Sequence, residues 1–203
     1  MNFSSLGQPA QQPAGGVLNL SKGGVLDLTK AAPSLSKVIL GCGWDVVTNG
    51  PTADLDLSAI LVPSGTPITA TNVLEHVVFF GNTRVQGAYS TGDNRTGVGE
   101  GDDEQIIVDL SQIAPNIDKI VFVVTIFEAQ QKRQPFGMVK NAFARLVNQE
   151  TDEEVCRYTL TNDYSSDTAI QFCSLNRKNG GWEFEALGKG AIADLNGILN
   201  QYM

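Results

Sequence analysis

The apolar residues of this chain gather into many short runs separated by turn signals, and this pattern constrains the fold more than any other feature. Segments such as 49–51, 63–65 and 179–181 carry the Gly, Pro and Asn that favour turns. Short strands at this spacing predict a mainly β protein, a β-sandwich of two packed sheets, rather than alternating strands and helices. The expected strands are Lys37–Gly41, Leu55–Val62, Leu74–Phe80, Gln105–Leu110, Lys119–Phe127, Ala142–Val147, Glu154–Leu160, Ala169–Cys173 and Trp182–Ala186.

The two ends of the chain differ from this pattern. Residues 1–16 are rich in Gln, Pro, Gly and Ser without an apolar period, which predicts a flexible tail before one domain over residues 17–203. Two similar eight-residue copies, 17–24 and 25–32, predict two short strands joined by a turn. Near the other end, residues 192–202 show a helical period, which predicts a short C-terminal helix.

The balance of charge narrows the classes of partner. The 203 residues include 22 acidic and 14 basic side chains, for a net charge of −8. Such a chain repels a phosphate backbone and attracts cations, so we expect no nucleic-acid partner. The longest apolar run, Ile120–Phe127, is too short to span a bilayer, and Met1–Phe3 shows no export signal. We therefore expect a cytoplasmic protein without direct membrane insertion.

Cysteine and histidine offer little chemistry here. Cys42, Cys156 and Cys173 form no Cys-x-x-Cys pair, which favours three reduced thiols in a cytosolic protein. The single histidine, His76, excludes zinc sites built on several imidazoles and leaves one candidate base for any catalytic triad. Because it lies in the alternating run 73–80, a place on a strand face is the favoured interpretation.

The segment from Gly92 to Glu104 is the most informative part of the sequence. It carries five carboxylates and one arginine, a local charge of about −4. Carboxylates this close repel one another, and a calcium ion removes the repulsion by accepting six to eight oxygen ligands. Its glycines allow the backbone to turn so that carbonyls also face an ion. The five carboxylates are Asp93, Glu100, Asp102, Asp103 and Glu104.

Other interpretations of this loop were tested against its residues. Asp93 and Glu104 have the spacing of positions 1 and 12 of an EF-hand loop, but Val98 stands where that loop needs a glycine. A phosphate cradle needs a Gly-Lys-Ser/Thr ending, which is missing, and acidity opposes an anion. A solvated acidic hairpin tip remains open. A glycosidase pair of carboxylates would need a separation that sequence alone does not show.

A second acidic element lies in the expected strand 55–62. Alternation places Asp54, Asp56 and Ser58 on one face and Leu55 and Leu57 on the other. The two aspartates either lie in solvent on the outer face or share a metal with the glycine-rich loop. The residues alone favour neither interpretation.

Together, these pieces resemble the TerD family of tellurium-resistance and stress-response proteins, over about residues 17–203. The matching segments are Leu20–Gly24, Gly41–Asp45, Asp54–Asp56, Gly92–Gly97, Gly101–Glu104, Val123–Ile126, Phe136–Gly137, Asn141–Val147, Trp182–Phe184 and Gly188–Gly190.

The resemblance implies a β-sandwich that binds one or two Ca2+ ions through the Asp-x-Asp strand and the Gly-Asp-Asn loop. This chain departs from the family's usual loop at Val98, where a carboxylate is lost, and at Glu100, which is longer than the usual Asp. Lower affinity or fewer ions are therefore expected. The candidate metal ligands are Asp54, Asp56, Asp93, Asn94, Thr96, Gly97, Gly99, Glu100, Asp102, Asp103 and Glu104.

The resemblance also implies a function. We expect a calcium-binding, non-catalytic module of bacterial tellurite resistance and chemical-stress response, acting through protein–protein contacts. Its expected partners are other proteins of a tellurium-resistance system, a membrane-embedded one among them, which would bring this protein to the membrane periphery. The alternatives are a metal-dependent hydrolase or phosphoryl-transfer enzyme that uses the same carboxylates, and a scaffold whose loop is acidic only for solubility.

The segment Gly41–Asp45 has a less certain role. Trp44 is expected in the core, and Asp45 is either a turn residue, which we favour, or a ligand. Cys42 is either a tellurite-reactive thiol or a buried side chain, and the second is the more common case.

Overall fold

The computed structural model describes residues 24–27, 35–46 and 52–203. The expected tail, residues 1–16, lies outside these ranges, and so does most of the repeat in residues 17–32. Within that repeat, β1 (Val25–Asp27) is a strand, as expected for its second copy.

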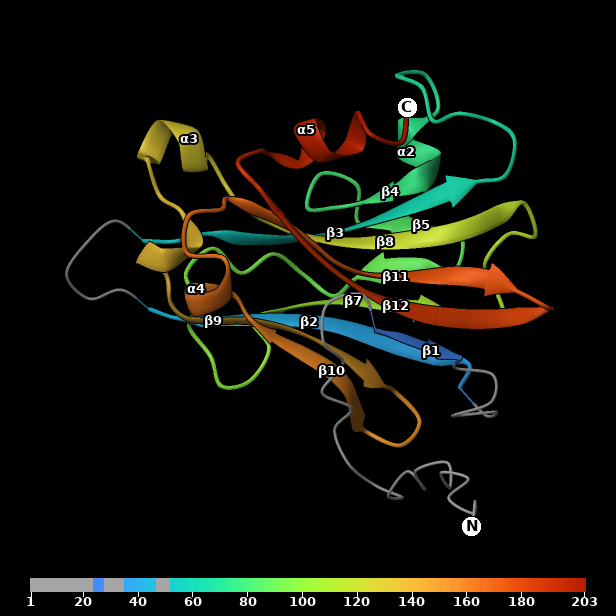
Figure 1. The fold of residues 1–203 in the computed structure, drawn as a ribbon, viewed down its shortest axis with the longest axis horizontal. Coiled ribbons are helices and arrows are strands. Elements are labelled where there is room, and N and C mark those ends of the chain that lie inside the picture. Colours follow the sequence, from blue (N-terminus) through green and yellow to red (C-terminus); the bar gives the residue numbers. More distant parts are fainter. Residues whose placement is uncertain (1–23, 28–34, 47–51) are drawn as a thin grey trace, which may run out of the picture.

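Two antiparallel sheets of six strands each account for about half of the described residues. Figure 1 shows β3, β8, β11 and β12 across the upper part of the molecule and β2, β9 and β10 across the lower part. This arrangement confirms the predicted mainly β fold with two sheets. In order, the first sheet contains β1, β12 (Gly181–Ala191), β11 (Ala169–Lys178), β8 (Ile117–Ile126), β3 (Leu55–Pro63) and β4 (Val77–Val78), and the second contains β10 (Glu153–Thr159), β9 (Lys140–Asn148), β2 (Lys37–Asp45), β7 (Glu104–Asp109), β6 (Ala88–Ser90) and β5 (Arg84–Val85).

The main core lies between the two sheets. Side chains alternate along the strands, so that Leu55 and Leu57 of β3 belong to this core together with Phe122 of β8. The predicted faces of β3 are therefore confirmed, because Asp54, Asp56 and Ser58 belong to the opposite face.

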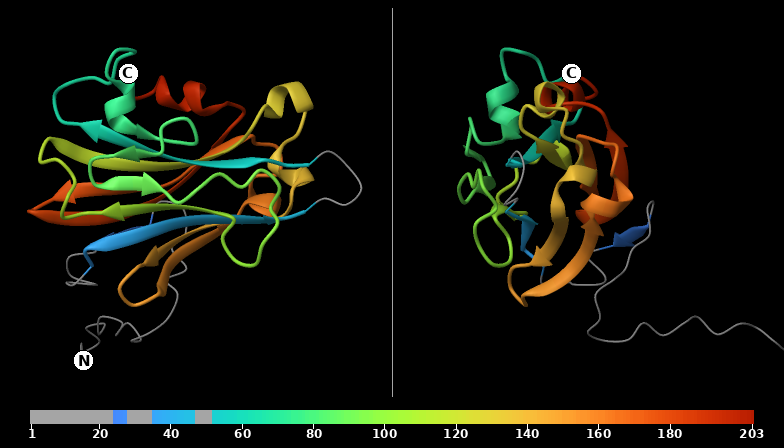
Figure 2. Two further views of the ribbon diagram at one scale, coloured as in Figure 1. Left: turned by 180° about the vertical axis from the view of Figure 1, so that it is seen from behind. Right: turned by 90° about the vertical axis from the view of Figure 1, so that its left-hand side faces the viewer.

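The outer face of the first sheet is also covered. Ile60, Val121 and Val123 form a second apolar cluster with Ile198 and Leu199 of α5 (Leu195–Leu199). This helix confirms the expected C-terminal helix over a shorter range than 192–202, and its first turn is capped by Asp194, which accepts a hydrogen bond from the Gly197 amide. Figure 2 shows α2 (Val73–His76), α3 (Ala129–Lys132) and α5 gathered on one side of the molecule.

The prediction of one strand over residues 74–80 is mostly wrong. This segment forms the short helix α2 and then the two-residue strand β4, so His76 ends a helix and does not lie on a strand face. Local side-chain bonds explain the error, since Asn82 Nδ2 donates to the carbonyls of Leu74 and Val77 at 2.8 and 2.7 Å. Leu74 is also 60% exposed, so the alternation here did not mark a core face.

Several short elements had no sequence prediction. They are β5, β6, α3, η1 (Phe136–Met138) and α4 (Leu160–Asp163). In Figure 1, α3 and α4 lie at the left end of the sandwich, where β3 begins. Among the residues that the structure describes, no helix is both long and apolar enough to cross a membrane.

Candidate metal centre

Three carboxylates from two distant segments converge at one end of the sandwich. Asp54 and Asp56 lie at the start of β3 in the first sheet, and Asp93 lies in the loop that leads to β7 in the second. One oxygen from each lies within 4.8 Å of the others. The structure thus brings together the two acidic elements, which lie about forty residues apart in sequence.

The cluster has little positive charge to balance it. Asp56 is only 6% exposed, and burial raises its pKa to about 7, with the charges of Asp54 and Asp93 adding to the effect. The Oδ1 atom of Asp54 is buried and has no hydrogen-bond partner. Arg95 contacts Asp93 at 2.9 Å with a side chain that is 75% exposed, and the charges of Arg95 and Lys132 offset only part of the rise in the pKa values of Asp54 and Asp56. Solvent exposure of Asp56, one of the two open interpretations, is therefore wrong.

Glu104 lies beside this cluster and joins the two sheets. β4 pairs with β3 only at Ala59 and Ile60, which leaves the amide of Leu57 beyond its end. That amide donates to Glu104 Oε2 at 2.9 Å, and the amide of Asn94 donates to Oε1 at 3.2 Å. Burial nevertheless raises the pKa of Glu104 to about 8, and the charges of Asp56 and Asp93 contribute to the shift.

Asn94 and Gly97 shape the loop around the cluster. The Asn94 Oδ1 atom accepts hydrogen bonds from the amides of Thr96 and Gly97, and its Nδ2 donates to Asp103 Oδ1 at 3.0 Å. Gly97 has φ +68°, and a Cβ there would come within 2.6 Å of Trp44 Nε1. A glycine is therefore required by both backbone and packing.

Two other predicted ligands hold the loop against the second sheet. The Asp102 carboxylate is almost fully buried and accepts two hydrogen bonds from the Arg145 guanidinium of β9, at 2.7 and 3.0 Å. Asp103 Oδ2 accepts a bond from the Trp44 amide at 2.9 Å. A Cβ at Gly41 would come within 2.2 Å of the Asp102 carboxylate, so this glycine makes the room that Asp102 occupies.

The remaining predicted ligands lie away from the three clustered carboxylates. Thr96, Gly99 and Glu100 are exposed towards the tip of the loop, as is Val98 at 68%. The eleven predicted residues thus divide into three that converge, five that hold or shape the loop, and three at its exposed tip.

Sequence reasoning did not find the residues that support the loop. Arg145 appeared only as part of a strand motif, although Ala142, Ala144 and Leu146 alternate with Phe143 and Arg145, which marks an outward-facing guanidinium. Gly41 and Gly43 flank Cys42 on β2, and a Cβ at Gly43 would meet the carbonyl of Gly101 at 2.4 Å. The acidic loop therefore packs directly against the Gly41–Asp45 segment of β2.

Trp44 and Cys42 follow the favoured interpretations, whereas Asp45, favoured as a turn residue, lies in a strand. Trp44 is 4% exposed in the core and donates from Nε1 to the Ala53 carbonyl at 3.1 Å. Cys42 is fully buried, and burial raises the pKa of its thiol well above the ordinary value, so it is a poor nucleophile. Asp45 ends β2 and pairs with Lys140 at 3.3 Å.

The donor set of the cluster suits a hard divalent cation. All three groups are carboxylates, which calcium and magnesium prefer and which zinc takes mainly beside nitrogen or sulfur. Oxygens on opposite sides of a calcium ion lie about 5 Å apart, which matches a cluster whose atoms lie within 4.8 Å of one another.

Comparisons with known proteins show which sequences this chain resembles. A family model described as the TerD domain matches residues 17–202. The "Tellurium resistance protein TerD" of Serratia marcescens is 46% identical over 188 residues, covering 91% of this chain and 96% of that protein. The "General stress protein 16U" of Bacillus subtilis (strain 168) is 44% identical over 189 residues, covering 91% and 96%.

Solved structures share the fold. A homologue of telluride resistance protein (TerD) from Streptomyces coelicolor A3(2) superposes with a TM-score of 0.67 at 21% sequence identity. The superposition covers 82% of this chain and 96% of that chain, so both sheets of the sandwich are common to the two proteins.

Proposed function

Because this chain belongs to the TerD family, a family of tellurium-resistance and stress-response proteins, we propose that it is a calcium-binding, non-catalytic module of such a response. The observation that carries the calcium proposal is the cluster of Asp54, Asp56 and Asp93. Their oxygens converge within 4.8 Å, and the buried Oδ1 atom of Asp54 has no protein partner. A bound cation would supply that partner and remove the mutual repulsion.

A module without catalysis agrees better with the surroundings of the cluster than a metal-dependent hydrolase or phosphoryl-transfer enzyme does. Such an enzyme needs a nucleophile or a general base beside the ion. His76 ends α2 and is not among the clustered side chains, and Cys42 is buried with a raised pKa. The carboxylates beside the cluster already have partners: Asp102 and Asp103 bind Arg145 and Trp44, and both oxygens of Glu104 accept backbone amides.

We further propose that the module acts through contacts with other proteins of a tellurium-resistance system, a membrane-embedded one among them. This places it in the cytoplasm or, through such a partner, at the membrane periphery. Val98, 68% exposed at the loop tip, offers an apolar contact on the loop that carries Asp93. The net charge of −8 opposes binding to nucleic acid.

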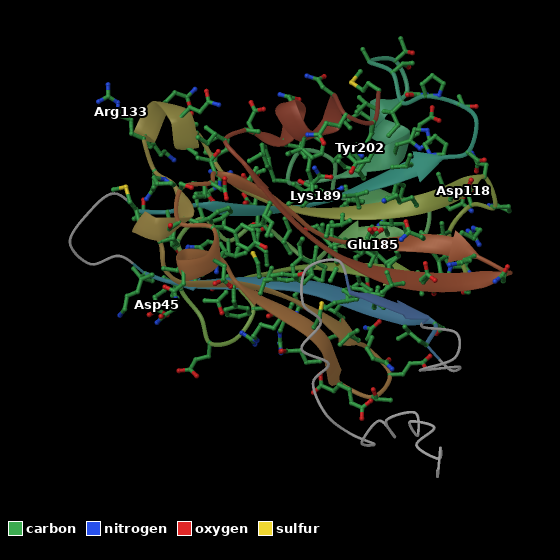
Figure 3. All side chains as sticks on the ribbon, in the orientation of Figure 1. Asp45, Asp118, Arg133, Glu185, Lys189 and Tyr202 are labelled. Carbon is green, nitrogen blue, oxygen red and sulfur yellow. The ribbon has the colours of Figure 1, made fainter. Side chains whose placement is uncertain are left out.

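Isothermal titration with calcium tests the proposal. The metal-free wild-type protein should bind one or two ions, and the Asp54→Asn/Asp56→Asn variant should bind more than about tenfold more weakly, because both ligand charges are lost. Asp118→Asn, which removes one carboxylate from an exposed position at the far end of the sandwich, should bind like the wild type (Figure 3). Equal titrations for the wild type and the double variant would contradict the assignment of this cluster.

A further inference from the structure

A cavity lies on the outer face of the first sheet, beside the acidic cluster, with which it shares Asp56. It is bounded by β3 and β8 below and by residues of α2, α3 and α5 around it, and its volume is about 380 Å³. Figure 1 shows these three helices on the same side of the first sheet, above β3 and β8. The volume lies near the lower end of the range for small-molecule pockets.

The floor of this cavity is polar. Asp56 of β3 pairs in register with Thr125 of β8, so the two side chains share a face, and Ser58 lies on the same face two residues further on. All three residues line the cavity. Ser58 is only 1% exposed, and its Oγ atom has no hydrogen-bond partner. A buried hydroxyl without a partner costs free energy, which a ligand in the cavity would recover.

The walls are apolar and partly aromatic. Phe79, Phe80 and Phe127 line the cavity, with ring centroids 5.3 Å apart for the first pair and 5.9 Å for Phe80 and Phe127. Phe80 is 47% exposed and Phe127 is 38% exposed, so their rings reach the mouth of the cavity. Leu195 and Leu199 of α5 add aliphatic surface. These walls suit an apolar body, while the Phe127 ring already has the Lys132 ammonium 5.2 Å from its centroid.

Among the described residues that line the cavity, the charged side chains are all acidic, although the cation Lys132 lies next to this lining. The charged residues among the described lining are Asp56, Glu128 and Asp194, and this lining contains no Lys, Arg or His. Glu128 lies 3.7 Å from Lys132, and Asp194 caps α5. Of these three carboxylates in the described lining, Asp56 is therefore the one that neither forms an ion pair nor caps a helix.

From this combination we propose that the cavity binds a small organic amine with an apolar body, such as an arylalkylamine. The ammonium group donates hydrogen bonds to the Asp56 carboxylate and to Ser58 Oγ, and the apolar body lies between the phenylalanine rings and α5. An alcohol of the same shape would lose the charge interaction with Asp56, and a carboxylate would be repelled by it. This inference does not depend on calcium binding, although an ion on Asp56 would compete with the amine.

Binding of 2-phenylethylamine, 2-phenylethanol and 3-phenylpropanoate to the metal-free protein tests the proposal. Titrations followed by amide NMR should show the amine binding at least about tenfold more tightly than the alcohol, with the acid weakest. The shifted amides should be those of β3 and β8 around Ser58 and Thr125. Failure of the amine to bind at 10 mM (about 3 kcal/mol of affinity), equal binding of the three compounds, or shifts confined to other surfaces would overturn it.

Two variants separate this cavity from the acidic cluster. Ser58→Ala should weaken amine binding by about fivefold to tenfold, the size of one hydrogen bond, and leave the calcium titration unchanged. Ser64→Ala, an exposed serine just beyond β3, is the matched control and should change neither. If Ser58→Ala does not fold, Asn196→Trp on the exposed side of α5 should block the cavity instead. Unaltered amine binding in a folded Ser58→Ala or Asn196→Trp variant would refute the assignment.

Discussion

Asp56 lies in an environment that opposes its own negative charge. It is buried, lies beside Asp54 and Asp93, and has no hydrogen-bond donor among its described neighbours, so its pKa rises to about 7. The same environment becomes favourable once a cation is bound. Such a residue lowers the stability of the metal-free folded state and raises the stability of the metal-bound one.

Replacing Asp56 by Asn should therefore have opposite effects in the two states. In EDTA at neutral pH, Asp56→Asn should stabilise the protein by on the order of 1 kcal/mol, because the repulsion falls and the new amide can donate to Asp54. In calcium, the variant should lose most of the stabilisation that the wild type gains. Urea denaturation in both conditions measures this, with Asp118→Asn as control. A variant less stable than the wild type in EDTA would contradict the account.

The raised pKa values also predict a pH dependence for the metal-free protein. Asp56 and Glu104 have folded-state pKa values of about 7 and 8, above their ordinary values of 3.8 and 4.5. The folded state binds more protons in this window, so stability is greatest below it and falls as the pH rises from about 4 to 8. The lowered pKa of Asp109 acts only at lower pH.

Urea midpoints at pH 5, 6, 7 and 8 in a chelator test this directly. We expect a steady decline that Glu104→Gln makes shallower and that saturating calcium removes, because calcium binds the ionised carboxylates. Stability that stays constant or increases between pH 5 and 8 without metal would show that these carboxylates ionise freely.

At the scale of elements, the acidic loop is anchored at one side and open at the other. Its last three residues are tied to β9, β2 and β3 through Asp102, Asp103 and Glu104. Its tip around Val98 and Glu100 is exposed. Two consequences of this asymmetry are open to measurement.

The first concerns the anchor to β9. Asp102→Asn should destabilise the protein by about 1.5–3 kcal/mol, since it removes the charge from a buried two-bond contact with Arg145. The loss should be smaller than for a fully buried pair, because Arg145 keeps a contact with Glu154 at 3.5 Å. Urea denaturation measures the loss, and a change below about 0.5 kcal/mol would mean that the ion pair does not hold the loop.

The second concerns the open side. Amide hydrogen exchange should slow on calcium addition across residues 92–101, where like charges and glycines favour open conformations without the ion. Residues 102–104 and the strand β9 should change little, because both are already held. Equal protection of residues 92–101 in both states would mean a preformed site, with calcium as a structural staple rather than a switch.

At the scale of the whole molecule, the cluster joins the two sheets at one end. Asp54 and Asp56 belong to the first sheet, and Asp93 leads into β7 of the second. In Figure 3, Asp45, which ends the neighbouring strand β2, lies at the opposite end of the sandwich from Asp118. An ion in the cluster would therefore link the two sheets at one end of the sandwich.

Calcium should accordingly raise the stability of the entire domain. At about one hundred times its Kd, calcium that binds only the folded state adds on the order of 2.7 kcal/mol. For a domain of this size, this corresponds to a rise of about 5–10 °C in Tm. Thermal melts in EDTA, millimolar magnesium and millimolar calcium measure the effect, with calcium expected to exceed magnesium. Superimposable melting curves in EDTA and in calcium would contradict the proposed calcium-binding function.

Much of the fold followed from local pattern. Alternation correctly placed Leu55 and Leu57 in the core and Asp56 and Ser58 on the other face, because the side-chain period of a strand is a local property. It failed at Leu74–Phe80, where the Asn82 side chain binds two carbonyls and the helix α2 forms instead. Periodicity describes the spacing of side chains but not the competing bonds to the backbone.

The sequence by itself determined the two sheets, the faces of β3 and the acidity of the loop. Only the tertiary structure decided that Asp56 is buried, because residues distant in sequence lie beside it, among them Asp93 and the residues of α3 and α5 that line the same cavity. It also decided that Asp102 binds Arg145, forty-three positions away, while Asp93 joins Asp54 and Asp56. Charge and periodicity are local properties of a chain, whereas burial and partnership depend on which distant segments pack together.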